Sequence, residues 1–193
     1  LGGWRLPKFA PVVEPADTRD SKSLEGNLMG VRLSPRPFLL ISKQTLMKIT
    51  ICGSIAFIDE MQNAKTLLEN IGHEIKLPPS EIPDERGDPM PAKDYYAIRK
   101  AADATDGWIW DRKEAAMRNH FNKVVWADAI LVLNHDKNNI PHYIGANTFL
   151  EMGLAFHHQK KIFLYNPIPE MASKEEIIGM RPIVINQQLS LIT

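Results

Sequence analysis

The chain has 193 residues, of which 44% are hydrophobic and 24% are charged, and its 23 basic and 23 acidic side chains give a formal net charge of zero. This balance predicts a globular domain with one core, and the absence of excess positive charge argues against a nucleic acid polymer as the main partner. With one cysteine, Cys52, no intrachain disulfide can form, and no apolar run reaches the roughly 18 residues that a membrane span needs. We therefore expect a cytoplasmic protein with no membrane partner.

The first 46 residues differ from the rest of the sequence. They contain five prolines and scattered charge, and they show no sustained hydrophobic period. Met47 then opens a run that is typical of a first strand. We expect residues 1–46 to be a flexible extension, or a segment that is not part of the natural protein, and residues 47–193 to form the folded domain. The alternative is that the first 46 residues form a regulatory arm.

From Lys48 onward, short apolar runs alternate with amphipathic runs. The expected strands are residues 48–52, 74–77, 129–133, 161–165 and 183–185. The expected helices are residues 58–71, 95–102, 112–126, 147–158 and 173–180. Residues 78–91 contain five prolines and a glycine, so we expect a long loop there. Strands separated by helices in this way predict parallel β-α-β units. We expect an α/β fold, a Rossmann-like or flavodoxin-like three-layer sandwich with a mostly parallel five-stranded sheet.

The expected binding crevice lies at the carboxyl ends of the strands, where such folds bind their ligands. Three loops meet there, because they follow the strands that end near Cys52, Leu77 and Leu133. The helix that begins near Asn147 lies at the edge of the same crevice.

The expected helix over residues 147–158 carries one charged side chain ahead of its terminal histidines, Glu151. Its other side chains are apolar nearly all round, which predicts a helix buried on most sides. A buried carboxylate without a partner is expensive, and the positive end of the helix macrodipole favours the ionised form near the start of a helix. An ionised carboxylate at the edge of a crevice is a competent nucleophile. From composition alone, the alternative is a glutamate on a solvated face or in a salt bridge with a lysine or arginine.

Three short segments carry a family resemblance. Glu151 is followed by Met152-Gly153-Leu154-Ala155, the first expected strand runs into Ile51-Cys52-Gly53-Ser54-Ile55, and the third begins with Ala127-Asp128-Ala129-Ile130. In this order and spacing, over residues 48–165, they resemble the nucleoside 2-deoxyribosyltransferase superfamily, which includes the deoxynucleoside monophosphate N-glycosidases. The resemblance implies a five-stranded Rossmann-like sheet, a homodimer or larger homo-oligomer, and a small-molecule nucleoside or nucleotide as substrate.

The resemblance also implies roles for individual residues. Glu151 would be the nucleophile that attacks the anomeric carbon and displaces the base, through a covalent glycosyl-enzyme. The backbone of Gly53 and Ser54, with Ile55 beside them, would line the sugar or phosphate pocket. Tyr143 would stack on the base. Further substrate contacts would come from the residues that lead into the glutamate helix, Gly145, Asn147 and Thr148.

The sequence departs from the family at two places. The transferases have an aspartate six residues before the nucleophile, where it helps to protonate the base, and this chain has Gly145 there. The monophosphate glycosidases have a serine there and a Gly-Gly-Arg phosphate loop after the first strand, where this chain has Ala56-Phe57-Ile58. The candidates for the missing acid are His135, Asp136 and His142, which share one polar loop near the expected crevice. The alternative is that this loop is simply solvated.

Aromatic and basic side chains gather in the second helical region. Tyr95 and Tyr96 could stack on a base, although their spacing is more typical of a core, and Arg99 could neutralise a phosphate. Asp128 is expected to orient a strand. No segment has the spacing of a zinc site, a Walker loop or a dinucleotide-binding loop, so the sequence predicts no metal and no cofactor.

The sequence thus favours an enzyme that cleaves or transfers the N-glycosidic bond of a nucleoside or nucleotide. Two alternatives stay open. One is a non-catalytic module that binds or senses a nucleotide, which the missing general acid favours. The other is an NAD-cleaving glycohydrolase, which also uses a glutamate.

Overall fold

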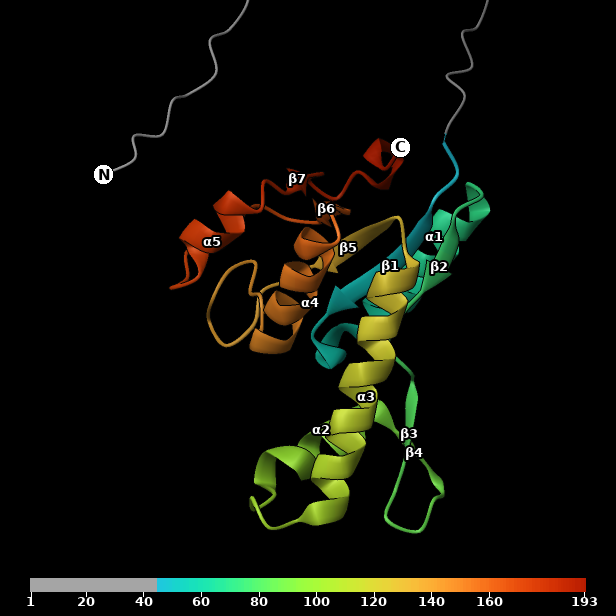
Figure 1. Cartoon of the computed structure of the whole chain (residues 1–193), viewed down its shortest axis with the longest axis vertical. Helices are drawn as coiled ribbons and strands as arrows, with labels where there is room; N and C mark the ends of the chain where they lie inside the picture. Colours follow the sequence, from blue (N-terminus) through green and yellow to red (C-terminus); the bar gives the residue numbers. More distant parts are fainter. Residues whose placement is uncertain (1–44) are drawn as a thin grey trace, which may run out of the picture. The chain divides into compact units, whose positions relative to one another are not determined.

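The computed structural model describes residues 45–193 (Figure 1). The expected extension over residues 1–46 lies outside the described residues, apart from its last two positions. The first strand is β1 (Lys48–Gly53), and its buried side chains belong to the core of the domain.

A five-stranded sheet forms the centre of the fold, in the order β2-β1-β5-β6-β7, and every neighbouring pair is parallel. Its strands are β1 (Lys48–Gly53), β2 (Glu74–Lys76), β5 (Ala129–Leu133), β6 (Lys161–Leu164) and β7 (Ile183–Val184). All five side chains of β5 are buried, as expected for a central strand covered on both faces. The expected α/β architecture is therefore confirmed.

Helices cover both faces of the sheet. One face packs against α1 (Ile58–Asn70) and the short 3-10 helix η2 (Leu189–Leu191), and the other against α3 (Gly107–Trp126), α4 (Ala146–His157) and α5 (Lys174–Gly179). Side chains alternate along β1, so Ile49 and Ile51 join the α1 side and Cys52 joins the α3 and α4 side. The result is the three-layer sandwich that the sequence predicts.

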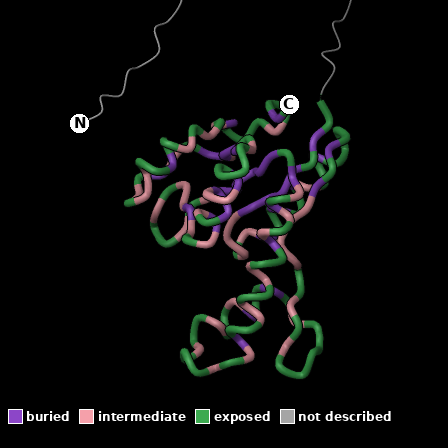
Figure 2. The backbone as a smooth tube through the Cα atoms, viewed as in Figure 1, coloured by how far each residue is buried: buried purple, intermediate pink, exposed green. Residues whose placement is uncertain are grey.

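The segment between β2 and the C-terminal half of α3 projects away from the sheet (Figure 1). It contains β3 (Glu81–Pro83), β4 (Pro89–Pro91) and α2 (Ala92–Ala101). Figure 2 shows that buried residues concentrate in the sheet and are sparse in this projecting part. The prediction of a plain loop over residues 78–91 is wrong, because β3 and β4 pair as an antiparallel hairpin. The Asp84 carboxylate closes its turn by accepting the backbone N–H groups of Arg86 and Asp88.

Helix α4 is less buried than its apolar sequence predicts. Met152 and Ala155 are fully buried, but Leu150 is 52% exposed and Phe156 is 54% exposed. The helix is thus half-buried: one face lies on the sheet, and the apolar side chains of Leu150 and Phe156 remain exposed. None of the helices in residues 45–193 has the combined length and hydrophobicity that a membrane crossing requires.

Close contacts fix both ends of β1, and only its carboxyl end, at Gly53, borders the crevice. The Asp128 carboxylate accepts a hydrogen bond from the backbone N–H of Lys48 at 2.9 Å, so it orients the start of β5 against β1 as expected. At the other end of β1, a Cβ on Gly53 would lie 2.9 Å from Cε of Met61 and 3.1 Å from the carbonyl oxygen of Leu133. Only a glycine lets the chain turn into the next loop at this close approach.

Candidate active site

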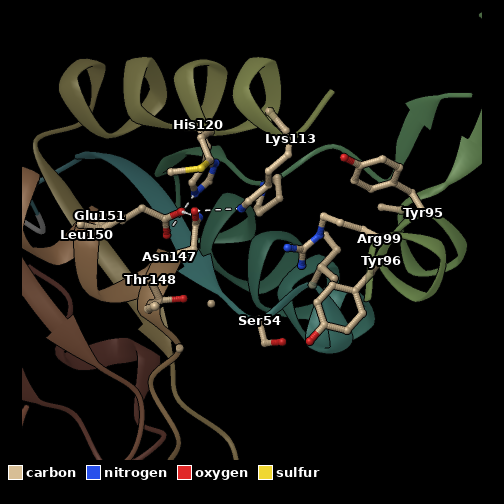
Figure 3. Close-up of a pocket in the computed structure, with 18 of the residues that line it drawn as sticks. Ser54, Tyr95, Tyr96, Arg99, Lys113, His120, Asn147, Thr148, Leu150 and Glu151 are labelled. Atoms are coloured by element: carbon tan, nitrogen blue, oxygen red, sulfur yellow. Dashed lines mark hydrogen bonds and ion pairs between the residues drawn. The ribbon is translucent and has the colours of Figure 1, made fainter. Parts of the chain in front are cut away.

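A cavity of about 440 Å³ lies at the carboxyl ends of β1, β2 and β5 (Figure 3). Its walls come from the loops after these three strands, from α2 and α3 in the projecting part, and from the N-terminal half of α4. The expected convergence of three loops and one helix is confirmed. A volume of this size suits a small organic ligand such as a nucleotide.

Glu151 is the only acidic side chain among the described residues that line the cavity. It belongs to α4, and its side chain is only 3% exposed. The Asn147 side-chain Nδ2 donates a hydrogen bond to Oε1 of Glu151 at 2.6 Å, and Lys113 Nζ donates one to Oδ1 of Asn147 at 3.1 Å. Figure 3 shows this chain of contacts across α3 and α4. Neither a solvated face nor a salt bridge with a lysine or arginine accounts for this glutamate in the described residues, because it is buried and its one ion-pair distance is to a histidine.

The protonation of Glu151 differs from the expectation. Burial, the largest effect, raises its pKa, while the Cys52 thiol, the Lys113 ammonium and the Asn147 amide lower it, and the resulting pKa is about 7. The helix macrodipole, worth about 0.3–1 kcal/mol near a helix end, does not keep the group fully ionised, because the net rise in the pKa corresponds to roughly 3 kcal/mol in favour of the neutral form. Near neutral pH, the carboxyl group is divided between its charged and neutral forms.

His120 on α3 faces the same carboxylate. Its Nε2 lies 3.7 Å from Oε2 of Glu151, and both side chains are buried. Burial, and after it the charge of Lys123, lowers the pKa of His120 to about 4. The imidazole is therefore neutral at physiological pH, and the pair carries at most the one negative charge of Glu151.

Three cationic side chains, Arg99, Lys113 and Lys137, line the cavity. Lys137 Nζ donates hydrogen bonds to the hydroxyl groups of Ser54 and Tyr96, at 3.3 Å for Tyr96. None of the three forms a salt bridge with a carboxylate in residues 45–193. Burial and the nearby Arg99 both lower the pKa of Lys113. Crowded cations without carboxylate partners form a site that attracts an anion.

All the residues expected to bind substrate lie around this one cavity. They are Gly53, Ser54, Ile55, Tyr143, Gly145, Asn147 and Thr148. The three candidate acids do not line it. Asp136 accepts the backbone N–H of His142 at 2.9 Å, and His135 packs its ring between Phe57 and Tyr165. These contacts stabilise the loop after β5, and the loop presents Lys137 to the cavity in their place.

Sequence reasoning missed His120, Lys113 and Lys137 as site residues. His120 and Lys113 lie on α3, two turns apart, where polar residues at helical spacing look like a solvated face. The aromatic and basic candidates Tyr95, Tyr96 and Arg99 all line the cavity. Tyr95 also has a structural role, because it is buried and donates its hydroxyl proton to the Ile109 carbonyl at 2.6 Å.

The chain was also compared with known proteins. No protein-family model matches it, and no curated protein matches its sequence. The resemblance of the three short segments therefore stays a prediction, and the functional argument rests on the geometry of the cavity.

Proposed function

We propose that this chain is a cytoplasmic enzyme that cleaves or transfers the N-glycosidic bond of a nucleoside or nucleotide, with Glu151 as its nucleophile. The observation that carries the proposal is that Glu151 is the only carboxylate among the described residues of the cavity lining, and that Asn147 donates a hydrogen bond to one of its oxygens. Its second oxygen, Oε2, has no hydrogen-bond partner in residues 45–193. A carboxylate with one oriented and one uncommitted oxygen is suited to attack a carbon electrophile.

The proposed reaction has two steps. Oε2 of Glu151 attacks the anomeric carbon, the bond from this carbon to the base breaks, and the base leaves with the electron pair and takes up a proton. Water or a second base then attacks the same carbon, and the bond to Glu151 breaks to restore the carboxylate. This is a retaining sequence in which one carboxylate acts as nucleophile. The charged form of Glu151 is the reactive one.

The cationic side of the cavity favours a substrate with a phosphate. Arg99 and Ser54 lie across the cavity from Glu151 (Figure 3), and Lys137 contacts Ser54. A phosphate there would accept hydrogen bonds from lysine, arginine and serine, as phosphate sites commonly do. We therefore propose a nucleoside monophosphate as the preferred substrate.

The proton for the leaving base needs a donor, because Gly145 stands where the transferases have an aspartate. Tyr143 lines the cavity, and its hydroxyl oxygen lies 3.7 Å from the place of a Cβ on Gly145. We propose Tyr143 as this donor, or as the residue that orients a water in the same role.

The test is release of free base from a panel of deoxynucleosides and their monophosphates, measured by chromatography. Glu151→Gln and Glu151→Ala should lower turnover by at least about 1,000-fold, because a covalent nucleophile has no substitute in the cavity. Glu175→Gln, which changes an exposed glutamate on α5, is the matched control. Unchanged turnover in both Glu151 variants would show that the carboxylate is not the nucleophile.

A non-catalytic nucleotide-binding module is the second candidate. It is favoured because none of the three candidate acids, His135, Asp136 and His142, is among the described residues that line the cavity. Calorimetry with a monophosphate separates the two proposals: binding without base release over a long incubation supports the module.

A homodimer is the proposed assembly. Leu150 at the cavity wall, and Phe156 further along α4, are both more than half exposed. On α3, a shallow depression has an apolar part, made by Trp110, Met117 and Phe121, and a charged part, made by Lys113, Glu114 and Arg118. Apolar surface of this kind is typical of an interface between copies. Light scattering should give twice the mass of the chain, and a monomer at all concentrations would exclude this assembly.

A further inference from the structure

Three side chains with metal-binding atoms meet beside the cavity. Cys52 at the end of β1, His120 on α3 and Glu151 on α4 each place one ligand atom within 4.8 Å of the other two, and all three residues are buried. The sulfur, nitrogen and oxygen donors come from three different elements of the fold. No spacing along the sequence reveals them, because only the packing of α3 and α4 on β1 brings them together.

Two of these residues hold polar atoms that nothing else satisfies. Both ring nitrogens of His120 and the Oε2 atom of Glu151 lack a hydrogen-bond partner in the described part of the chain. The side chains are 5% and 3% exposed. A buried polar atom without a partner destabilises the folded state. A ligand that coordinates a histidine nitrogen and the free carboxylate oxygen would remove part of that cost.

The charge of the cluster suits one doubly charged cation. Burial, and then the adjacent Glu151, raises the pKa of the Cys52 thiol, so the thiol is protonated in the metal-free chain. A thiolate, a carboxylate and one divalent ion sum to zero. The cations that face the cluster are Lys113 toward Glu151 and Lys123 toward His120. They repel the metal cation, but they attract the thiolate and the carboxylate that bind it, so the two effects oppose each other.

We propose that Cys52, His120 and Glu151 bind one Zn²⁺ ion. Thiolate, imidazole and carboxylate are the ligands that zinc takes in proteins, and the thiolate selects zinc over magnesium and calcium. His120 and Glu151 line the cavity, so a fourth, open position would face it. Binding replaces the proton on Cys52, and any proton on Glu151, with bonds to zinc and releases these protons to solvent. Affinity therefore rises with pH.

One consequence rests on the proposed function. A zinc ion on Glu151 occupies the oxygen that would attack the anomeric carbon, so zinc inhibits base release, and a chelator restores it. The metal site itself does not depend on the reaction, because its three ligands hold the ion whether or not the cavity takes a nucleotide.

The test uses Co²⁺, a spectroscopic substitute for zinc, with the full chain and no substrate. A bond from thiolate to cobalt absorbs in the near-ultraviolet, and Cys52 is the single cysteine of the chain, so any such band reports this residue. We expect the band to saturate at one equivalent of Co²⁺ and to vanish when Zn²⁺ displaces the cobalt. Absence of the band with excess Co²⁺ at pH 8 would overturn the proposal.

The variant His120→Gln distinguishes a metal site with three ligands from metal binding by Cys52 alone. It should weaken Co²⁺ binding by more than about 100-fold. Substitution of a residue that only hydrogen-bonds to a metal ligand weakens binding by about 10–100-fold. His157→Gln, in the last turn of α4, is the matched control and should bind as the parent does. Wild-type affinity in His120→Gln, with an unchanged far-ultraviolet circular dichroism spectrum, would also overturn it.

Failure of the enzyme proposal and failure of the metal proposal give different results. Cobalt binding without base release leaves the zinc site standing and removes the nucleophile. Base release without the thiolate band overturns the zinc site and leaves the enzyme proposal standing.

Discussion

The side chain of Asn147 holds one oxygen of Glu151 from one turn earlier on α4, through a 2.6 Å hydrogen bond from Nδ2 to Oε1. The same amide accepts a hydrogen bond from Lys113 on α3. The orientation of the carboxylate therefore depends on the packing of α3 against α4, and changes at Asn147 should affect the chemistry of Glu151 before they affect the fold.

Asn147→Asp tests this dependence. The substitution replaces a donor with a second acid beside Glu151, and a like charge there raises the pKa of Glu151 further. If Glu151 is the nucleophile, we expect activity at pH 7 to fall by about 10–100-fold and to recover partly at higher pH. The measurement is the pH profile of kcat/KM. Asn122→Asp, at an exposed position of α3, should leave the profile unchanged.

Glu151→Gln should make the protein more stable at alkaline pH. The folded state raises the pKa of Glu151 from 4.5 to about 7, so the protonated carboxyl stabilises the fold below pH 4.5, and this contribution is lost as the pH rises through 7. The loss amounts to roughly 3 kcal/mol. Since glutamine is neutral at all pH values, the variant should exceed the parent at pH 8 in chemical unfolding. Equal stability of the two proteins at pH 8 would contradict the raised pKa.

The opposite dependence should come from His120. Its pKa is lowered from 6.5 to about 4, so its contribution is complete above pH 6.5 and is lost as the pH falls through 4. That loss is also roughly 3 kcal/mol. Compared with the parent, His120→Gln should therefore lose less stability between pH 7 and pH 4 in chemical unfolding. His157→Gln serves as control, and identical acid sensitivity in parent and His120→Gln would count against a buried neutral imidazole.

Lys137→Met tests the proposed phosphate site. Lys137 contacts both Ser54 and Tyr96 at the cavity wall, and its loss should raise KM for a nucleoside monophosphate by about 10–100-fold, which corresponds to about 1.4–2.7 kcal/mol. KM for the unphosphorylated nucleoside should stay within about twofold. Lys174→Met, which breaks an exposed ion pair with Glu170, is the matched control. An equal rise in KM for the monophosphate and the nucleoside would show that Lys137 does not bind the phosphate.

Gly53→Ala should destabilise the fold at the cavity floor. The added Cβ would press on Met61 and on the Leu133 carbonyl, and overpacking of this kind costs about 1–3 kcal/mol. Gly107→Ala is a sharp comparison, because nothing lies within 4 Å of its added Cβ. Thermal unfolding of the two variants should separate them clearly, and equal melting temperatures would show that β1 and β5 can move apart.

The fold was predictable because its signals are local. The apolar runs of β1, β5 and β6 and the amphipathic run of α1 have the lengths and periods that are typical of alternating strands and helices in an α/β fold. The β3–β4 hairpin was not predictable from the sequence, because its three-residue strands contain prolines at their ends and have no buried side chain. Strands so short show no period in a sequence.

The candidate site was predictable only in part. Glu151 stood out as one charge in an apolar helix, but its pKa depends on burial among residues distant in sequence, and burial outweighed the helix macrodipole. His120 reaches Glu151 only through the packing of α3 on α4, and nothing in its local sequence marks it. Contacts between elements are the part of a site that sequence periodicity does not report.

The sheet provides the hydrophobic cores, whereas the projecting segment provides part of the cavity wall. Neither hydrophobic core of the described residues has a buried member between residues 78 and 123, yet Tyr96, Arg99 and Lys113 in that stretch line the cavity. Ligand preference can therefore be changed at Tyr96 and Arg99, by natural variation or by engineering, without altering a residue of either hydrophobic core.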